Sequence, residues 1–350
     1  LAKQASVIVT DCGYLLIQRE WRKYAAQKIL CPLIQVETDA ICPIHVVSQK
    51  EEYSAGTIRN KIKKNIHSFM NSIKRSSLKH SSLHCKIDLK QPITITDSLN
   101  FNLKHCDSSV KPVTWITGGT KSAKKLLQEF VSSKLPYYES HRNDPSQDFQ
   151  SHMSPFLHFG QISPLYIAEK IIQSGQSPAT EAYLEELIIR RELSLNFAYY
   201  NTQYANFTCL PVWAKNSLLL HKKDERDVIY SIESLENAET HNPYWNAAQK
   251  ELLIKGKMHA YVRMYWGKKI IQWTSSPKQA FNTVLYLNNK YSLDGRDANS
   301  YAGVAWCFGK HDRAWKERPI FGKIRYMNSN GLKRKFDIEN YVKKINALVQ

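Results

Sequence analysis

Apolar residues recur at helical spacing through residues 258–273, and this stretch has the most informative pattern in the chain. They form a single stripe at positions 258, 261, 262, 265, 266, 270 and 273. Trp266 and Trp273 are seven residues apart, so they lie on one helical face, roughly 10 Å apart along the axis. The stripe predicts a buried helix whose tryptophans, with Trp245 upstream, could relay an electron. Core packing is the commoner role of such a stripe.

The pattern before residue 60 is different. Residues 5–10 and 33–37 predict short strands, and helical spacing runs from 14 to 30 between them. Alternating strands and helices are typical of a parallel sheet, so we expect residues 1–60 to be the C-terminal part of a Rossmann-like α/β domain. Two or three strands are too few for a complete doubly wound domain, and we expect the first strands to precede Leu1.

From residue 120 to residue 350 the pattern predicts an all-α domain without strands or internal repeats. The segments with helical spacing, separated by Pro and by Gly, Asn and Asp clusters, are 122–132, 164–174, 179–199, 243–255, 256–273, 277–289 and 299–306. Residues 61–119 have weak periodicity and are rich in Lys, Ser, His and Asn. They predict a basic interdomain linker with some helix.

Charge narrows the function classes. The chain has 49 Lys and Arg against 31 Asp and Glu, a net charge of +18. Such a basic protein most often binds a polyanion, with nucleic acid the first candidate and acidic lipid the second. No run of eighteen apolar residues is present, so we expect no membrane insertion. The seven cysteines lack metal-binding spacing, which predicts free thiols in a reducing, intracellular compartment and no metal site.

Two polar stretches have the composition of binding loops. Residues 138–145 and 151–164 place Ser and Pro where helices begin, and hydroxyls at helix starts suit a phosphate, with Arg142 supplying charge. A capped helix start without a ligand is an equal alternative. Residues 288–306 are densely polar between two apolar helices, which is costly to bury unless something is bound. A surface loop with internal ion pairs is the alternative there.

Charged and aromatic residues add two further observations. Residues 181–197 carry opposite charges four positions apart, which favours an ordinary helix with ion pairs; a buried Glu186 beside a cavity would instead be a proton donor or hydrogen-bond partner. Five of the eight tryptophans fall within one seventy-residue span, at 245, 266, 273, 306 and 315. Aromatic residues beside basic ones can stack on a base removed from a duplex.

Several motifs, in the order in which they occur along the chain, resemble those of class II cyclobutane pyrimidine dimer photolyases, of the photolyase/cryptochrome superfamily. In the N-terminal part the matching stretches are 9–15, 21–22, 35–39 and 50–53. In the helical part they are 142–145, 154–163, 256–259, 293–297 and 323–327. The resemblance extends over essentially the whole chain, and several long motifs in order are more specific than any one of them.

The resemblance implies that residues 120–350 bind FAD in a U shape. The implied cofactor-binding residues are Tyr138, Ser151, Met153, Ser154, Arg263, Asp294, Arg296 and Asp297. The first four would surround the phosphates, and Arg263 and Asp294 would form an ion pair beside the flavin ring. Asn288 would face the flavin N5 atom. The missing strands leave the presence of an antenna chromophore open.

The resemblance also implies a substrate pocket and an electron path. The pocket residues would be Arg142, Asn143, Arg190, Met264 and Trp306, with Arg190 at a position where some relatives have Trp. Glu186 would hydrogen-bond the thymine dimer. Trp266 would be the tryptophan nearest the flavin, Trp245 would lead toward solvent, and Trp273 would be a side branch.

The implied activity is light-driven DNA repair by a monomer. Excited FADH⁻ would give an electron to a flipped-out dimer in single- or double-stranded UV-damaged DNA, and the electron would return after the ring splits. The rival functions are a cryptochrome-like light sensor without repair and a DNA-binding module without a cofactor. Glu186, Arg142 and Asn143 favour repair, because a sensor has no need of a dimer pocket.

Overall fold

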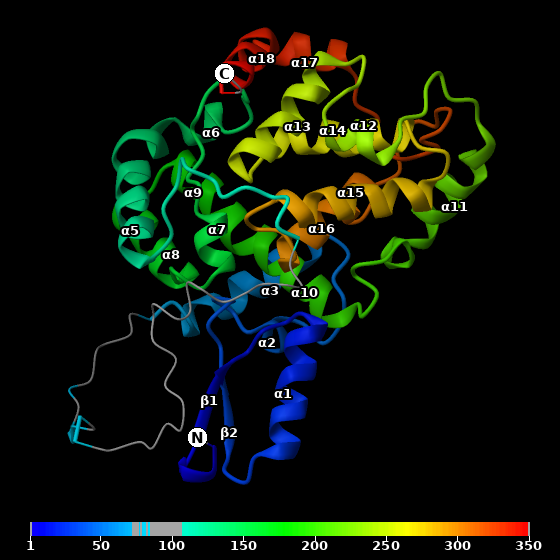
Figure 1. Cartoon of the computed structure of the whole chain (residues 1–350). Coiled ribbons are helices and arrows are strands. Elements are labelled where there is room, and N and C mark those ends of the chain that lie inside the picture. Colours follow the sequence, from blue (N-terminus) through cyan, green and yellow to red (C-terminus); the bar gives the residue numbers. More distant parts are fainter. Residues whose placement is uncertain (1, 72–76, 78, 82, 85–106, 349–350) are drawn as a thin grey trace.

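The computed structural model describes residues 2–71, 77, 79–81, 83–84 and 107–348, and it divides into a small α/β part and a larger helical part (Figure 1). Strands β1 (Ile8–Asp11) and β2 (Leu33–Val36) pair in parallel, with helix α1 (Leu16–Lys28) between them in sequence. Ile8 lies opposite Leu33. The predicted parallel pairing is therefore confirmed, although β1 begins at residue 8 rather than residue 5. No residue of α1 is buried.

Residues 40–62 join the two parts through shared apolar cores. Helix α2 (Ile44–Val47) and helix α3 (Ala55–Asn65) follow β2. Ile44 belongs to one core of the helical part, and Ile58 and Ile62 belong to a second one. All three side chains are fully buried. Helix α3 thus continues across the expected boundary between residues 60 and 61, and residues 85–106 of the expected linker lie outside the described residues.

The remainder is helical, as predicted, and in the described range 107–348 the one β-type pairing is an isolated bridge between Arg318 and Gly322. The helices are α5 (Thr120–Glu129), α6 (Tyr138–His141), α7 (Ser154–His158), α8 (Pro164–Gln173), α9 (Pro178–Leu184), α10 (Arg191–Tyr200), α11 (Val212–Leu220), α12 (Ile232–Glu236), α13 (Pro243–Lys255), α14 (Ala260–Gln272), α15 (Pro277–Tyr291), α16 (Ala298–Cys307), α17 (Ser329–Lys335) and α18 (Ile338–Asn346). Among the described residues, none of these helices is long and apolar enough to cross a bilayer.

Two predicted helices are interrupted where the site is built. The helix predicted over 179–199 contains a π-helical turn at Glu185–Arg190 between α9 and α10, and such turns are frequent at functional sites. The helix predicted over 256–273 begins only at Ala260. Gly256 ends α13 with a φ of 59°, and the His259 side chain then caps α14 by accepting the backbone N–H of Tyr261.

Candidate active site

A cavity of about 440 Å³ lies inside the helical part, and most of the predicted cofactor and substrate residues line it. The predicted residues in its wall are Tyr138, Arg142, Asn143, Ser151, Met153, Ser154, Glu186, Arg190, Met264, Asp294, Asp297 and Trp306. They come from α6 and the residues that follow it, from the start of α7 and the segment before it, from the π-helical turn, and from α14, α16 and the loop between α15 and α16. The structure thus brings together segments that are far apart in the sequence.

One side of the cavity is formed by the segment Ser151–Ser154. The Ser151 hydroxyl accepts a hydrogen bond from the Tyr183 hydroxyl at 3.0 Å. His152 has a left-handed backbone with a φ of 57°, and its Nε2 lies 2.7 Å from an Asp148 carboxylate oxygen. Its Nδ1 lies 3.1 Å from the Lys257 ammonium. Because that ammonium can only donate, Nδ1 accepts and Nε2 carries the proton.

Lys257 is a wall residue that the sequence reasoning missed. Its remaining accessible surface lines the cavity. Burial lowers the pKa of Lys257 to about 8, while the charge of Asp294 opposes this shift. Burial and then the charge of Lys257 lower the pKa of His152, so that imidazole is neutral at pH 7. Lys257 lies within the matched motif 256–259, which was the signal available in the sequence.

Asp294 also lines the cavity and has an unused acceptor. Its Oδ1 is buried and has no hydrogen-bond partner among the described residues, and Arg263 Nη2 is 3.8 Å away. The predicted ion pair is therefore present but loose. Asn288 does not line the cavity; it is buried behind Ser300 and donates to the Ser300 hydroxyl at 2.5 Å. Arg296 is exposed and also lies outside the wall.

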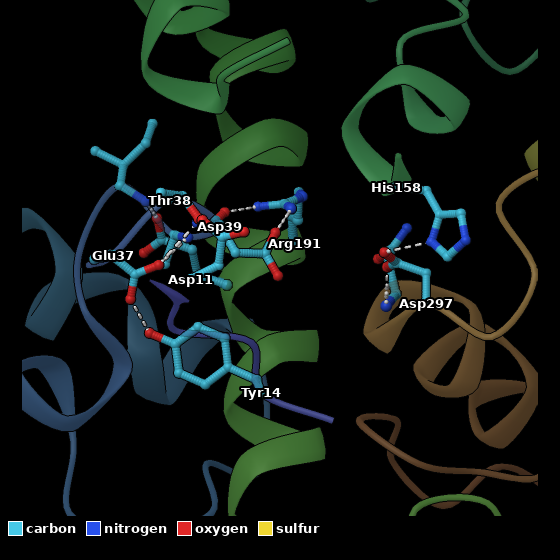
Figure 2. A network of polar contacts seen from close by, with 12 residues as sticks. Asp11, Tyr14, Glu37, Thr38, Asp39, His158, Arg191 and Asp297 are labelled. Atoms are coloured by element: carbon cyan, nitrogen blue, oxygen red, sulfur yellow. Dashed lines mark hydrogen bonds and ion pairs between the residues drawn. The ribbon is translucent and has the colours of Figure 1, made fainter. Parts of the chain in front are cut away.

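A polar network links the wall to the α/β part (Figure 2). The Arg191 guanidinium bonds both the backbone carbonyl and the carboxylate of Asp39. Burial favours the neutral form of Asp297, but the contact from His158 at 3.3 Å and the Arg191 charge outweigh it and lower the pKa of Asp297. Asp297 also faces a second cavity of about 800 Å³ between the two parts. Arg191 thus couples the α/β part to the cavity.

The outer side of the cavity carries a charged pair. Arg142 Nη1 lies 2.8 Å from Glu186 Oε1, and 43% of the Glu186 side-chain surface is exposed. The alternative of a buried Glu186 is therefore wrong, although the residue does line the cavity. The Arg190 guanidinium lies over the Trp306 ring at 5.7 Å and pairs with Glu185 at 3.5 Å.

Three tryptophans form a buried cluster behind the cavity. The rings of Trp245 and Trp266 are stacked, and Trp245 meets Trp273 edge-on with centroids 5.6 Å apart. Each of the three side chains has 2% or less of its surface exposed. Because Trp245 is itself buried, a path that runs from Trp266 through Trp245 toward solvent would have to continue beyond Trp245. The cluster continues from Trp273 to Tyr230, whose hydroxyl bonds His241 near the surface at 2.6 Å.

An aromatic and basic group lies at the rim. Arg325 lines the cavity, and its guanidinium lies 5.3 Å from the centroid of the Trp315 ring. Arg313 lies 5.2 Å from the same ring, which is 40% exposed. Two predictions pointed to this region: the clustering of tryptophans and the matching stretch 323–327, which contains Arg325.

Comparison with known proteins identifies the family. No protein-family model matches the chain. It is 50% identical over 349 residues to the deoxyribodipyrimidine photo-lyase of Methanothermobacter thermautotrophicus, covering 99% of this chain and 76% of that protein. It is 41% identical to the deoxyribodipyrimidine photo-lyase of Potorous tridactylus, covering 97% and 64%.

Solved structures show the same fold at low identity. A bacterial class III photolyase from Agrobacterium tumefaciens matches with a TM-score of 0.69 at 16% identity, over 97% of this chain and 68% of that one. A Synechocystis cryptochrome matches with a TM-score of 0.70 at 16% identity, over 98% and 69%. The sequence relatives are decisive: the chain belongs to the deoxyribodipyrimidine photo-lyase family.

Proposed function

We propose that this chain uses light to repair cyclobutane pyrimidine dimers in UV-damaged DNA, with FAD as its cofactor. The observation that carries the proposal is one cavity that has the Arg142–Glu186 pair on its outer side and the stacked Trp245 and Trp266 behind it. A relative 50% identical is named as a deoxyribodipyrimidine photo-lyase. The pocket would hold the dimer, and the tryptophan path would return oxidised flavin to the reduced form that repair needs.

The wall fits FAD chemically. The unpartnered Asp294 Oδ1 is an acceptor for an N–H group of a flavin ring. The Ser151 and Ser154 hydroxyls and the Lys257 ammonium supply donors and positive charge for a diphosphate. When bound in its reduced form FADH⁻, the cofactor supplies the excited electron that opens the cyclobutane ring and takes it back.

The substrate residues position the dimer. Arg142, Asn143 and Glu186 offer donors and an acceptor to the polar edges of two flipped-out pyrimidines. Met264 and Trp306 provide an apolar surface for their faces, and the Arg190 guanidinium over Trp306 extends it.

The net charge of +18 supports binding to the DNA backbone. Such binding releases counterions, so affinity for damaged DNA should fall steeply as salt is raised. We also propose that the active unit is a monomer, that its catalytic domain comprises residues 120–350, and that it acts in an intracellular, reducing compartment. Gel filtration with and without DNA tests the monomer.

Repair of a defined oligonucleotide tests the function. The purified chain, reconstituted with FAD and reduced, is illuminated with blue light in the presence of DNA containing one thymine dimer. Restoration of the thymine absorbance in light, and none in the dark, is the expected result. Flavin bands without any restoration would leave the light-sensor function, and failure to bind FAD would exclude both light-driven functions.

A further inference from the structure

Residues 313–325 form a hairpin-like segment at the mouth of the cavity, which we call the rim loop. The backbone N–H of Trp315 donates to the Lys323 carbonyl at 2.9 Å, and Arg318 and Gly322 exchange two backbone hydrogen bonds. At the base of the loop, Arg325 lines the cavity and flanks the exposed Trp315 ring. The conformation of the loop therefore decides where an aromatic ring and its cationic neighbours meet DNA.

The turn of the rim loop is strained and is held from outside the loop. Ile320 has a φ of 68°, which is unfavourable for a β-branched residue. Its backbone N–H donates to Asp224 Oδ2 at 2.7 Å. The backbone N–H of Lys323 donates to the Ser217 hydroxyl at 2.7 Å. Because these acceptors lie on α11 and just after it, the turn depends on contacts with that segment.

His221 connects the same segment to the loop. Its Nδ1 lies 2.6 Å from Asp224 Oδ2, the atom that also accepts the Ile320 N–H. Its Nε2 lies 2.9 Å from Glu317 Oε1, on the rim loop. Both ring nitrogens thus face carboxylates, and only the imidazolium form can donate to both.

The surroundings of His221 contain charges of both signs. Glu225 and Arg318 line the same surface hollow as His221, Asp224 and Glu317. Other cations near its partners are Arg226, which acts on Asp224, and Lys323, which acts on Glu317. The direct hydrogen bonds with Glu317 and Asp224 are the largest influences on the pKa of the imidazole, and both favour its charged form.

We propose that His221 is a positioning residue for DNA binding. As an imidazolium it joins Asp224 to Glu317 and holds the rim loop so that Trp315 and Arg325 remain at the mouth of the cavity. The inference rests on the proposed function, since it assigns the rim loop to contact with damaged DNA. It adds a residue that does not itself touch DNA, dimer or flavin.

This arrangement makes the loop sensitive to pH in one direction. The hydrogen bonds with Glu317 and Asp224 raise the pKa of His221 above its ordinary value. Both contacts are therefore present below the ordinary pKa of about 6.5, and one is lost as pH rises through the raised pKa. His221 is partly exposed, so the effect is modest but measurable.

Two variants and one control test the proposal in the full-length protein. His221→Gln keeps a polar side chain but cannot bridge two carboxylates, and Glu317→Gln removes the charge on the loop side. His45→Gln replaces an exposed histidine and serves as the control. The first measurement is the Kd for a duplex with one dimer and for its undamaged counterpart, at constant ionic strength, between about pH 6.5 and 8.5.

The second measurement is the rate of tryptic cleavage after Arg313 and Lys323, which needs no DNA. At the acidic end, we expect both loop variants to bind dimer DNA about fivefold more weakly and to be cleaved faster, with their FAD content unchanged. Wild-type protein should lose this advantage toward the alkaline end, while His45→Gln follows the wild type.

The outcomes separate the two proposals. Wild-type affinity and wild-type cleavage in both loop variants would overturn the role of His221. If His221→Gln fails to fold, Glu317→Gln gives the same test from the loop side. If the wild type does not prefer damaged DNA, the proposed function fails, whereas the cleavage rates still decide whether His221 holds the loop.

Discussion

The indole rings of Trp245 and Trp266 stack with centroids 6.4 Å apart and planes only 9° from parallel. Hydrogen bonds fix both rings: Trp266 Nε1 donates to Gln249 Oε1 at 2.9 Å, and Trp245 Nε1 donates to the Trp266 carbonyl at 3.0 Å. An aromatic pair held this closely in a buried setting is suited to electron hopping. Because Trp245 donates to the backbone carbonyl of Trp266, the Trp266 side chain can be replaced without removing this hydrogen bond.

Replacing Trp266 with Phe should abolish photoreduction of oxidised FAD while leaving repair by pre-reduced enzyme largely intact. The reason is that photoreduction needs an electron from the protein, whereas repair returns its electron to the flavin. Flash absorption spectroscopy and the dimer assay measure the two activities separately. Trp213→Phe is the control, because that ring packs near Gly309, away from the cluster. Equal loss of both activities would contradict the assignment.

Replacing Glu186 with Ala should lower the repair yield several-fold without releasing FAD. The side chain lies on the outer side of the cavity and pairs with Arg142, so its removal affects the dimer more than the flavin. Repair per absorbed photon and the ratio of flavin to protein absorbance report on the two effects. Glu181→Ala, an exposed change on the same helical stretch, should alter neither. Loss of flavin would show that Glu186 is structural.

FAD binding should take up protons above about pH 8 through Lys257. Burial lowers the pKa of Lys257 to about 8, so the free protein loses this charge as pH rises, and a bound diphosphate would favour the charged form again. Affinity for FAD should therefore fall from pH 8 toward the ordinary lysine pKa of about 10.4.

Calorimetric titration of the flavin-free protein, in buffers that differ in ionisation enthalpy, measures this uptake. Lys257→Met should bind FAD about tenfold more weakly and without the uptake. Lys268→Met is the control, because Lys268 is a buried lysine that also has a pKa of about 8 but does not line the cavity. The same uptake in Lys257→Met would assign the proton to another group.

Removing the charge of Asp39 should destabilise the fold by about 3 kcal/mol, since it leaves the buried Arg191 guanidinium without its principal partner. Urea denaturation monitored by circular dichroism measures the change. Asp11→Asn is the control. The Asp11 carboxylate also lies in the α/β part and accepts an exposed hydrogen bond from the Thr38 hydroxyl, so its substitution should lower the free energy of unfolding by less than about 0.5 kcal/mol. Equal stability of the two variants would mean that Asp297 alone suffices for Arg191.

Long, regular elements could be predicted from the sequence. Helix α13 has the predicted bounds, Pro243–Lys255, because Asn242 and Pro243 mark its start and Gly256 its end. The π-helical turn at Glu185–Arg190 could not be predicted, because its apolar residues are compatible with an uninterrupted helix. Helices α11, α12, α17 and α18 were not identified individually, since α12 and α17 are short and α11 is apolar on most sides.

The site was predictable where it rests on motifs and not where it rests on packing. Ser151, Ser154 and Asp294, which the resemblance assigns to one cofactor site, line the same cavity. Lys257 escaped notice because a lysine before an apolar helix is usually exposed, and only the fold encloses it. His221 and Glu317 are 96 residues apart, and nothing in the spacing of the chain pairs them.

Residues 40–62 have a consequence for how this protein can be divided. Their side chains complete two apolar cores of the helical part, and the Glu192 carboxylate accepts the backbone N–H groups of Ile41 and Cys42. A fragment that started near residue 120 would therefore expose two apolar surfaces and leave the Glu192 carboxylate without its two backbone donors. Such a fragment would be prone to aggregate. Tyr14 is buried in one of these cores as well, and its hydroxyl accepts the backbone N–H of Ile44, so the smallest fragment worth expressing begins before Tyr14.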